Sequence, residues 1–206
     1  DFYVGATMRL TGDSKDNFEA VLTRLEGWQK LLPRTTTGRI ARATVLVEYA
    51  WYARGSGWAS SVTDQGQKLM QERLEEAEGL IEAAQKHEKD DVQLYLVGMR
   101  VDLGLGKPDR ASERAEAALK LDPMDAQVFG QMANLLLPRW YGTPGMVAEW
   151  ARETGLPQAP ALCYVALTPF EDPAVFEEAG LQWPAVRKSF QAALKEPHAP
   201  PWLADF

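Results

Sequence analysis

The side chains that most often perform covalent or metal chemistry are few in this 206-residue chain. Cys163 is the single cysteine and lies between Leu162 and Tyr164 in an apolar run, while the two histidines are His87 and His198. A lone cysteine excludes an intrachain disulfide and a multi-cysteine metal site. A Cys–His nucleophile would need one histidine beside Cys163 in space, and nothing near them in the sequence indicates it. We therefore expect a buried, inert Cys163, no catalytic residue, no cofactor and no metal.

Motifs of the common enzyme classes are also missing from the sequence. It contains no HExxH, no GxSxG and no phosphate-binding glycine loop. Glu75 and Glu76 diverge as neighbours on one predicted helix, and Glu171-Asp172 resembles a helix cap. Because any two carboxylates can meet across a fold, a hydrolase that uses paired carboxylates stays as an alternative. The leading prediction is a protein that is not an enzyme.

Two short segments combine arginine with aromatic residues and glycine at the end of a predicted helix. They are WYARGSGWA at 51–59 and LLPRWYG at 136–142. Arginine presents a planar fork of donors and stacks on aromatic rings, so Arg54 and Arg139 could bind a carboxylate or the carbonyls of a peptide. The alternative is structural, because an arginine in a last helical turn binds free carbonyls and the next glycine turns the chain. The sequence leaves both roles open.

The elements that must position these residues are helices. Apolar residues recur at helical spacing and no convincing alternating strand appears, which predicts an all-α fold. Ser14, Asp91 and Thr143 are expected N-caps, Pro108 a first-turn residue, and Gly55 a helix end. Prolines break the region between 155 and 182 into short pieces. The expected helices cover 14–32, 38–54, 65–88, 92–105, 108–121, 125–137, 144–154 and 183–195.

The stretch 92–123 carries the strongest repeat signal. Ala111, Ala115 and Ala118 recur at i, i+4 and i+7, before a stop at Asp122-Pro123. Small residues at this spacing let antiparallel helices approach closely, as in the 34-residue tetratricopeptide (TPR) repeat. We therefore expect a TPR-like α-solenoid of about four to five antiparallel helix pairs. It would form a right-handed superhelix with an irregular C-terminal part and a proline-rich strap at 197–206. Since no linker appears, 1–206 is expected to be one domain.

The sequences of the two arginine segments resemble motifs of a bacterial TPR-like family of unknown function. The resemblance rests on ARGSGWASSVT at 53–63 and LLPRWYGTPG at 136–145 and extends over 38–155, and GLQWP at 180–184 is similar to that family's final helix entry. It implies a helical-repeat fold and no catalytic residue. Related sequences continue into further helices, whereas this chain has a proline-rich tail after Lys195. The residues that the resemblance implies shape the turns are Arg54, Gly55, Gly57, Arg139, Trp140 and Gly142.

Composition and charge narrow the classes of partner. The apolar content of 46% and charged content of 25% are those of a folded globular protein. The formal charge is −7, with eight basic against six acidic residues in 1–60 and fourteen against twenty-three in 61–206. An acidic chain without a basic stripe argues against nucleic acid. No apolar run reaches the ~18 residues that membrane insertion requires.

We therefore predict a non-enzymatic scaffold that binds a peptide or partner protein, basic in charge if the acidic surface takes part, on its concave face. An acidic inhibitor or immunity protein that neutralises a secreted toxin is the main alternative. The chain opens at Asp1 rather than methionine, so we expect that a leader or upstream segment has been removed. The expected location is the cytoplasm, with the periplasm as alternative. The candidate partner-binding residues are Trp51, Arg54, Trp58, Tyr95, Arg100, Asn134, Arg139 and Trp140.

Overall fold

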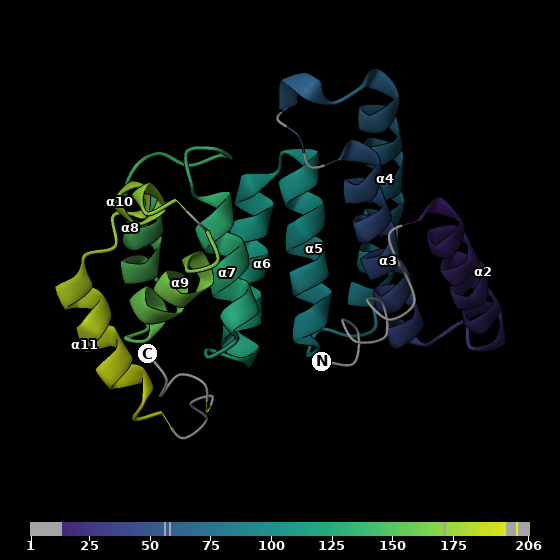
Figure 1. Cartoon of the computed structure of the whole chain (residues 1–206). Coiled ribbons are helices and arrows are strands. Elements are labelled where there is room, and N and C mark those ends of the chain that lie inside the picture. The colour runs from purple at the N-terminus through teal and green to yellow at the C-terminus, as the bar shows by residue number, and fades with distance from the viewer. Residues whose placement is uncertain (1–13, 56, 58, 171, 197–200, 202–206) are drawn as a thin grey trace. The chain divides into compact units, whose positions relative to one another are not determined.

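The structure is a computed structural model that describes residues 14–55, 57, 59–170, 172–196 and 201. Throughout these ranges the regular elements are helices and no strand occurs, so the all-α prediction is confirmed (Figure 1). Apart from Pro201, the predicted strap at 197–206 lies outside the described residues. The chain divides into two compact units, 1–107 and 108–206, and each is described by itself. The single domain and the TPR-like pairing stay predictions.

The first unit consists of long helices that lie side by side (Figure 1). They are α2 (Lys15–Leu31), α3 (Thr36–Arg54), α4 (Asp64–Gln85) and α5 (Val92–Leu105), with a 3₁₀ turn at Ala59–Ser61. Helix α3 is central because it packs against α2, α4 and α5. Apolar residues at helical spacing face inward from α3, α4 and α5, so each helix buries one stripe. Fully buried members of this core include Ile40, Val47, Leu74, Ile81, Leu94 and Val101.

Local caps explain where these helices begin and end. The Ser14 hydroxyl accepts a hydrogen bond from the Asn17 N–H, and the Asp91 carboxylate accepts one from the Gln93 N–H, as predicted. Helix α3 ends at Gly55, whose φ of 76° lies in the region that favours glycine. Each boundary is therefore set by the residue at the boundary itself.

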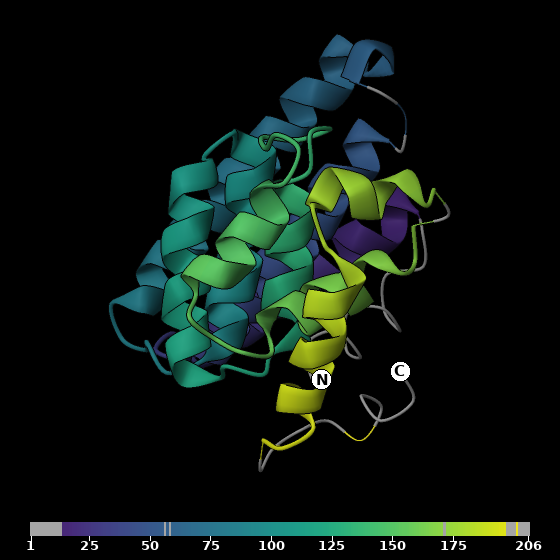
Figure 2. The ribbon, with the colours of Figure 1, turned by 90° about the vertical axis from the view of Figure 1, so that its left-hand side faces the viewer.

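The second unit is built from shorter helices set at varied angles to one another (Figure 2). They are α6 (Pro108–Leu121), α7 (Ala126–Leu135), α8 (Met146–Glu153), α9 (Ala159–Leu167), α10 (Ala174–Ala179) and α11 (Trp183–Ala193). Helix α9 is central because it packs against α7, α8, α10 and α11. The sequence of α9 is apolar on more than one face, as expected for a helix that is surrounded by other helices. Fully buried residues of the unit include Phe129, Met132, Leu137, Leu162 and Leu167.

Two expectations for the second unit are wrong in detail. Helix α8 begins at Met146 and its N-cap is Gly145, so Thr143 does not cap it. Gly145 has a φ of 91°, and its N–H donates to the Glu178 carbonyl at 2.7 Å, a contact from beyond α9. The proline-broken region contains α9 and α10, because Pro160 and Pro173 lie at helix starts. There the missing N–H has no helical partner to lose, so proline starts a helix.

Within the described residues, no helix combines the length and the apolar content that crossing a lipid bilayer requires.

Candidate functional site

In the first arginine segment, the side chain of Arg54 contacts neighbouring residues at the end of α3. The Arg54 guanidinium donates to the carbonyls of Gly55 and Gly57 at 3.2 and 3.0 Å, and it lies 5.7 Å from the centre of the Trp51 ring. Trp51 itself packs, half-buried, against the core of the first unit. Both carbonyls belong to the turn that follows α3 and not to its last helical turn, so both roles of Arg54 stay predictions. Trp58, the remaining candidate of this segment, lies outside the described residues.

The second arginine segment forms a comparable local arrangement after α7. Arg139 donates to the Asn134 side-chain oxygen at 2.7 Å, and its guanidinium carbon lies 4.1 Å from the centre of the Phe170 ring. Burial lowers the pKa of Arg139, and the carboxylate of Glu178 opposes this shift. Trp140 is half-buried beside it. The structure thus brings Asn134 and Arg139 together and ties them to the segment that follows α9.

Gly142 is required by the turn of this second segment. A Cβ atom at this position would lie 1.8 Å from the carbonyl oxygen of Leu136. No side chain can be accommodated at that distance unless the backbone moves. The resemblance implied a turn-shaping role for Gly142, and this close approach of two backbone segments supplies its physical reason.

The two candidates on α5 contact neighbours within the first unit. The Tyr95 hydroxyl donates to the Lys89 carbonyl at 2.9 Å, and burial raises its pKa with smaller contributions from nearby carboxylates. Arg100 forms an ion pair with Glu48 of α3. Within this unit Trp51 contacts Arg54, and within the second unit Asn134 contacts Arg139. Their roles as partner contacts stay predictions.

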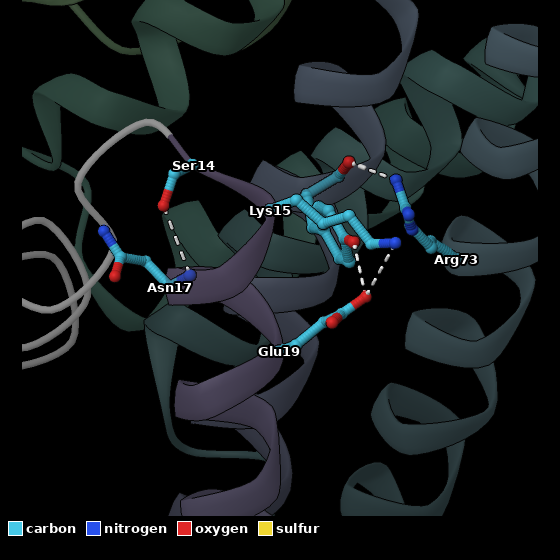
Figure 3. A network of polar contacts seen from close by, with 6 residues as sticks. Ser14, Lys15, Asn17, Glu19 and Arg73 are labelled. Carbon is cyan, nitrogen blue, oxygen red and sulfur yellow. Dashed lines mark hydrogen bonds and ion pairs between the residues drawn. The ribbon is translucent and has the colours of Figure 1, made fainter.

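Sequence reasoning missed a network that joins α2, α3 and α4 (Figure 3). The Arg73 guanidinium lies 3.3 Å from the centre of the Tyr49 ring and donates to the Tyr49 carbonyl at 2.8 Å. Phe18 stacks on Tyr49 at 4.7 Å between ring centres, and the Tyr49 hydroxyl donates to Glu19 at 3.2 Å. Since these groups contact one another, the network holds three helices together. No sequence spacing indicates a contact between residues 24 positions apart.

A second cluster missed by the sequence reasoning lies in the second unit and is only partly covered. We call it the aromatic patch, and it consists of Tyr164, Phe176, Trp183 and Phe190. The Tyr164 ring stacks on Phe176 at 4.6 Å and lies 5.7 Å from Trp183 and 6.4 Å from Phe190. Phe190 is buried, whereas Trp183 is 53% exposed. Leu194, three turns along α11 from Trp183, is 50% exposed.

The aromatic patch has the properties of a contact surface. Trp183 is the first residue of α11 and is followed by Pro184, so the backbone that carries it is restricted. Its ring packs beside the Tyr164 ring, which limits the conformational entropy lost on binding. Tryptophan and tyrosine are the residues most often found at the energetic centre of protein interfaces. The GLQWP motif was the sequence signal for this position, although it indicated a helix start and not a site.

The described part of the chain also contains side chains of the types that most often bind metals or act as nucleophiles. No group of three or more His, Cys, Asp or Glu side chains there is placed to hold a metal ion. Cys163 is fully buried, as predicted, and burial raises the pKa of its thiol. No family model, no curated protein and no solved structure matches this chain. The function must therefore be inferred from the surfaces of the molecule.

Proposed function

We propose that the protein is a non-enzymatic interaction module that binds a partner protein or peptide through the aromatic patch. The observation that carries this proposal is the exposure of Trp183. A large aromatic ring that is half in solvent, yet packed beside the Tyr164 ring, offers apolar area at little entropic cost. Burial of that area by a partner is favourable because apolar surface leaves water. Tyr164 contacts the ring and is itself stacked on Phe176, so it would limit the movement of Trp183.

The charge of the second unit favours a basic partner. Residues 108–206 carry eight basic against thirteen acidic side chains. Asp172, which precedes α10, and Glu177 of α10 are both exposed, and Arg187 of α11 is exposed as well. A partner segment with an apolar anchor and basic residues toward α10 would match this distribution. The proposed partner is therefore a protein or peptide with that chemistry.

The predicted arrangement of the helices in pairs belongs to the same proposal. We propose a TPR-like solenoid of four to five antiparallel helix pairs with right-handed superhelical twist, related to the bacterial family that the two arginine segments resemble. The 14-residue lengths of both α5 and α6 support it, because a 34-residue TPR unit holds two helices of about this size. The pairs Trp51–Arg54 and Asn134–Arg139 stay secondary candidates for partner contact.

Capture of partners from a lysate of the native organism tests the proposed function. The baits are the wild-type chain, Trp183→Ala and Tyr52→Ala, and bound proteins are quantified by mass spectrometry. Tyr52 is a matched control because it is 46% exposed and rests on the Phe18 ring at 5.4 Å in the first unit. We expect proteins that wild type and Tyr52→Ala enrich and Trp183→Ala does not. Equal enrichment by all three baits would contradict the role of the aromatic patch.

A further inference from the structure

A pocket of about 450 Å³ opens in the second unit between α8 and α11. More than half of the residues around it are glycine, alanine or proline, which leaves space between the helices. This volume falls within the range of about 300–1,000 Å³ typical of small-molecule sites. Among the described residues that line it, Arg152 is the one charged side chain and Gln182 the one other polar side chain. Its apolar walls include Ala148, Ala151, Pro157, Pro160, Ala185 and Val186.

The walls of this pocket are held in place by buried hydrogen bonds. The Ser189 hydroxyl of α11 accepts from the Ala161 N–H at 2.9 Å and donates to the Pro157 carbonyl at 2.7 Å. Ser189 is buried, so this clamp fixes α11 against the start of α9. On the other side, the bond from Gly145 to Glu178 fixes the start of α8 to α10. A pocket with fixed walls binds a ligand without having to order itself first.

The mouth of the pocket offers donors of hydrogen bonds. Arg152 approaches Glu149 at 3.6 Å, but their side chains are 74% and 58% exposed. An ion pair this exposed contributes only about 0–1 kcal/mol, so a ligand anion can replace Glu149. Gln182 precedes α11 as its N-cap residue, yet its side chain does not cap the helix. Since no acidic residue belongs to the lining, the pocket favours an anion over a cation.

We propose that this pocket binds a small amphipathic carboxylate. Its aliphatic or aromatic body would lie between α8 and α11, and its carboxylate would accept hydrogen bonds from Arg152 and Gln182. Arginine suits this task because its planar fork matches the two oxygens of a carboxylate. The inference goes beyond the proposed partner binding, because neither Trp183 nor Leu194 lines this pocket.

Three probes separate the contribution of the body from that of the charge. Octanoate carries both features, octylammonium has the same body with the opposite charge, and acetate has the carboxylate alone. Binding to the full chain is followed by ¹H–¹⁵N NMR titration. We expect octanoate to cause saturable shifts that centre on amides of α8 and α11, and we expect neither octylammonium nor acetate to do so. Octylammonium that binds as tightly as octanoate, or octanoate that does not bind, would overturn the proposal.

Variants of the lining test the location of the ligand. Arg152→Gln should weaken octanoate binding about tenfold through the loss of a charged hydrogen bond. Arg187→Gln is the matched control, since Arg187 is exposed on α11 but does not line the pocket, and it should leave binding unchanged. Equal affinity of wild type and Arg152→Gln would contradict the proposed carboxylate contact.

Ala185→Leu and Ala185→Trp fill the pocket from an exposed position, so the fold should tolerate both substitutions. We expect Ala185→Leu to weaken octanoate binding and Ala185→Trp to abolish it. Saturable binding that survives Ala185→Trp at wild-type affinity would overturn the assignment. If octanoate does not bind and Ala185→Trp instead loses captured proteins, the pocket belongs to a protein partner and the small-ligand inference is wrong.

Discussion

Arg73 makes two contacts with a single residue of a neighbouring helix. Its guanidinium lies over the Tyr49 ring and donates to the Tyr49 carbonyl (Figure 3). Arg73→Met keeps an apolar stem but loses both contacts, so the free energy of unfolding should fall by about 2 kcal/mol in urea denaturation. Lys68→Met is the control on the same helix, because the exposed pair of Lys68 with Glu72 at 3.8 Å should contribute less than about 0.5 kcal/mol. Equal losses would contradict the role of the network.

Because of the same network, we expect the free energy of unfolding to fall at alkaline pH. Burial raises the pKa of Tyr49, Arg73 opposes the rise and Glu19 adds to it. The folded protein therefore holds this proton more tightly than the unfolded chain, in which tyrosine titrates near pH ~10. The stability that Tyr49 contributes is complete below that pH and declines as the pH rises above it.

Urea denaturation between about pH 8 and 11 measures this decline. Tyr49→Phe should make it shallower, and the rest should persist because burial also raises the pKa of the Cys163 thiol and of Tyr95. The same slope in wild type and Tyr49→Phe would show that Tyr49 does not cause it.

At the scale of elements, two glycines should respond in opposite directions to alanine. Gly142→Ala would place a Cβ 1.8 Å from the Leu136 carbonyl oxygen, and we expect a loss of about 3 kcal/mol or more. Gly79 lies exposed inside α4, where an added Cβ would meet no neighbouring group within 4 Å, so Gly79→Ala should stabilise by about 1 kcal/mol through helix propensity. Thermal unfolding of both variants checks the pair. A tolerated Gly142→Ala would mean that the turn after α7 can rearrange.

Helix boundaries could be predicted where the deciding residue lies at the boundary. The ranges 92–105 and 108–121 agree with α5 and α6 because Asp91 caps one helix and Pro108 begins the other. The start of α8 could not be predicted, because the backbone of Gly145 is held by Glu178 from beyond α9. Helix α9 was missed for a related reason. Its prolines were interpreted as breaks, although their position relative to the helix makes them starts.

The contacts of the candidate sites also fall into two groups, those that are local in the sequence and those between distant segments. The carbonyls that Arg54 binds lie within three residues of it, so local reasoning could anticipate contacts of this kind. The contacts of Tyr164 with Phe176 and Trp183 depend on how α9, α10 and α11 pack. The pocket wall fixed by Ser189 likewise joins segments about thirty residues apart. Such clusters have no sequence period, so only a three-dimensional structure reveals them.

At the scale of the whole molecule, charge separates the leading function from its main alternative. The first unit carries fourteen basic against sixteen acidic residues, and the second eight against thirteen. A toxin inhibitor that relies on this acidic charge would associate quickly and bind much more weakly at high ionic strength. A partner anchored mainly on the Trp183 ring would lose less affinity, because apolar burial is not screened by salt.

The most direct measurement is the affinity of a captured partner for the full chain, determined by isothermal titration calorimetry. Wild type, Trp183→Ala and Tyr52→Ala are compared at low and high salt. The account predicts that Trp183→Ala weakens binding by about 30-fold or more, as truncation of a central aromatic does, and that Tyr52→Ala has no effect. Equal affinities of wild type and Trp183→Ala would contradict the claim that the aromatic patch binds the partner.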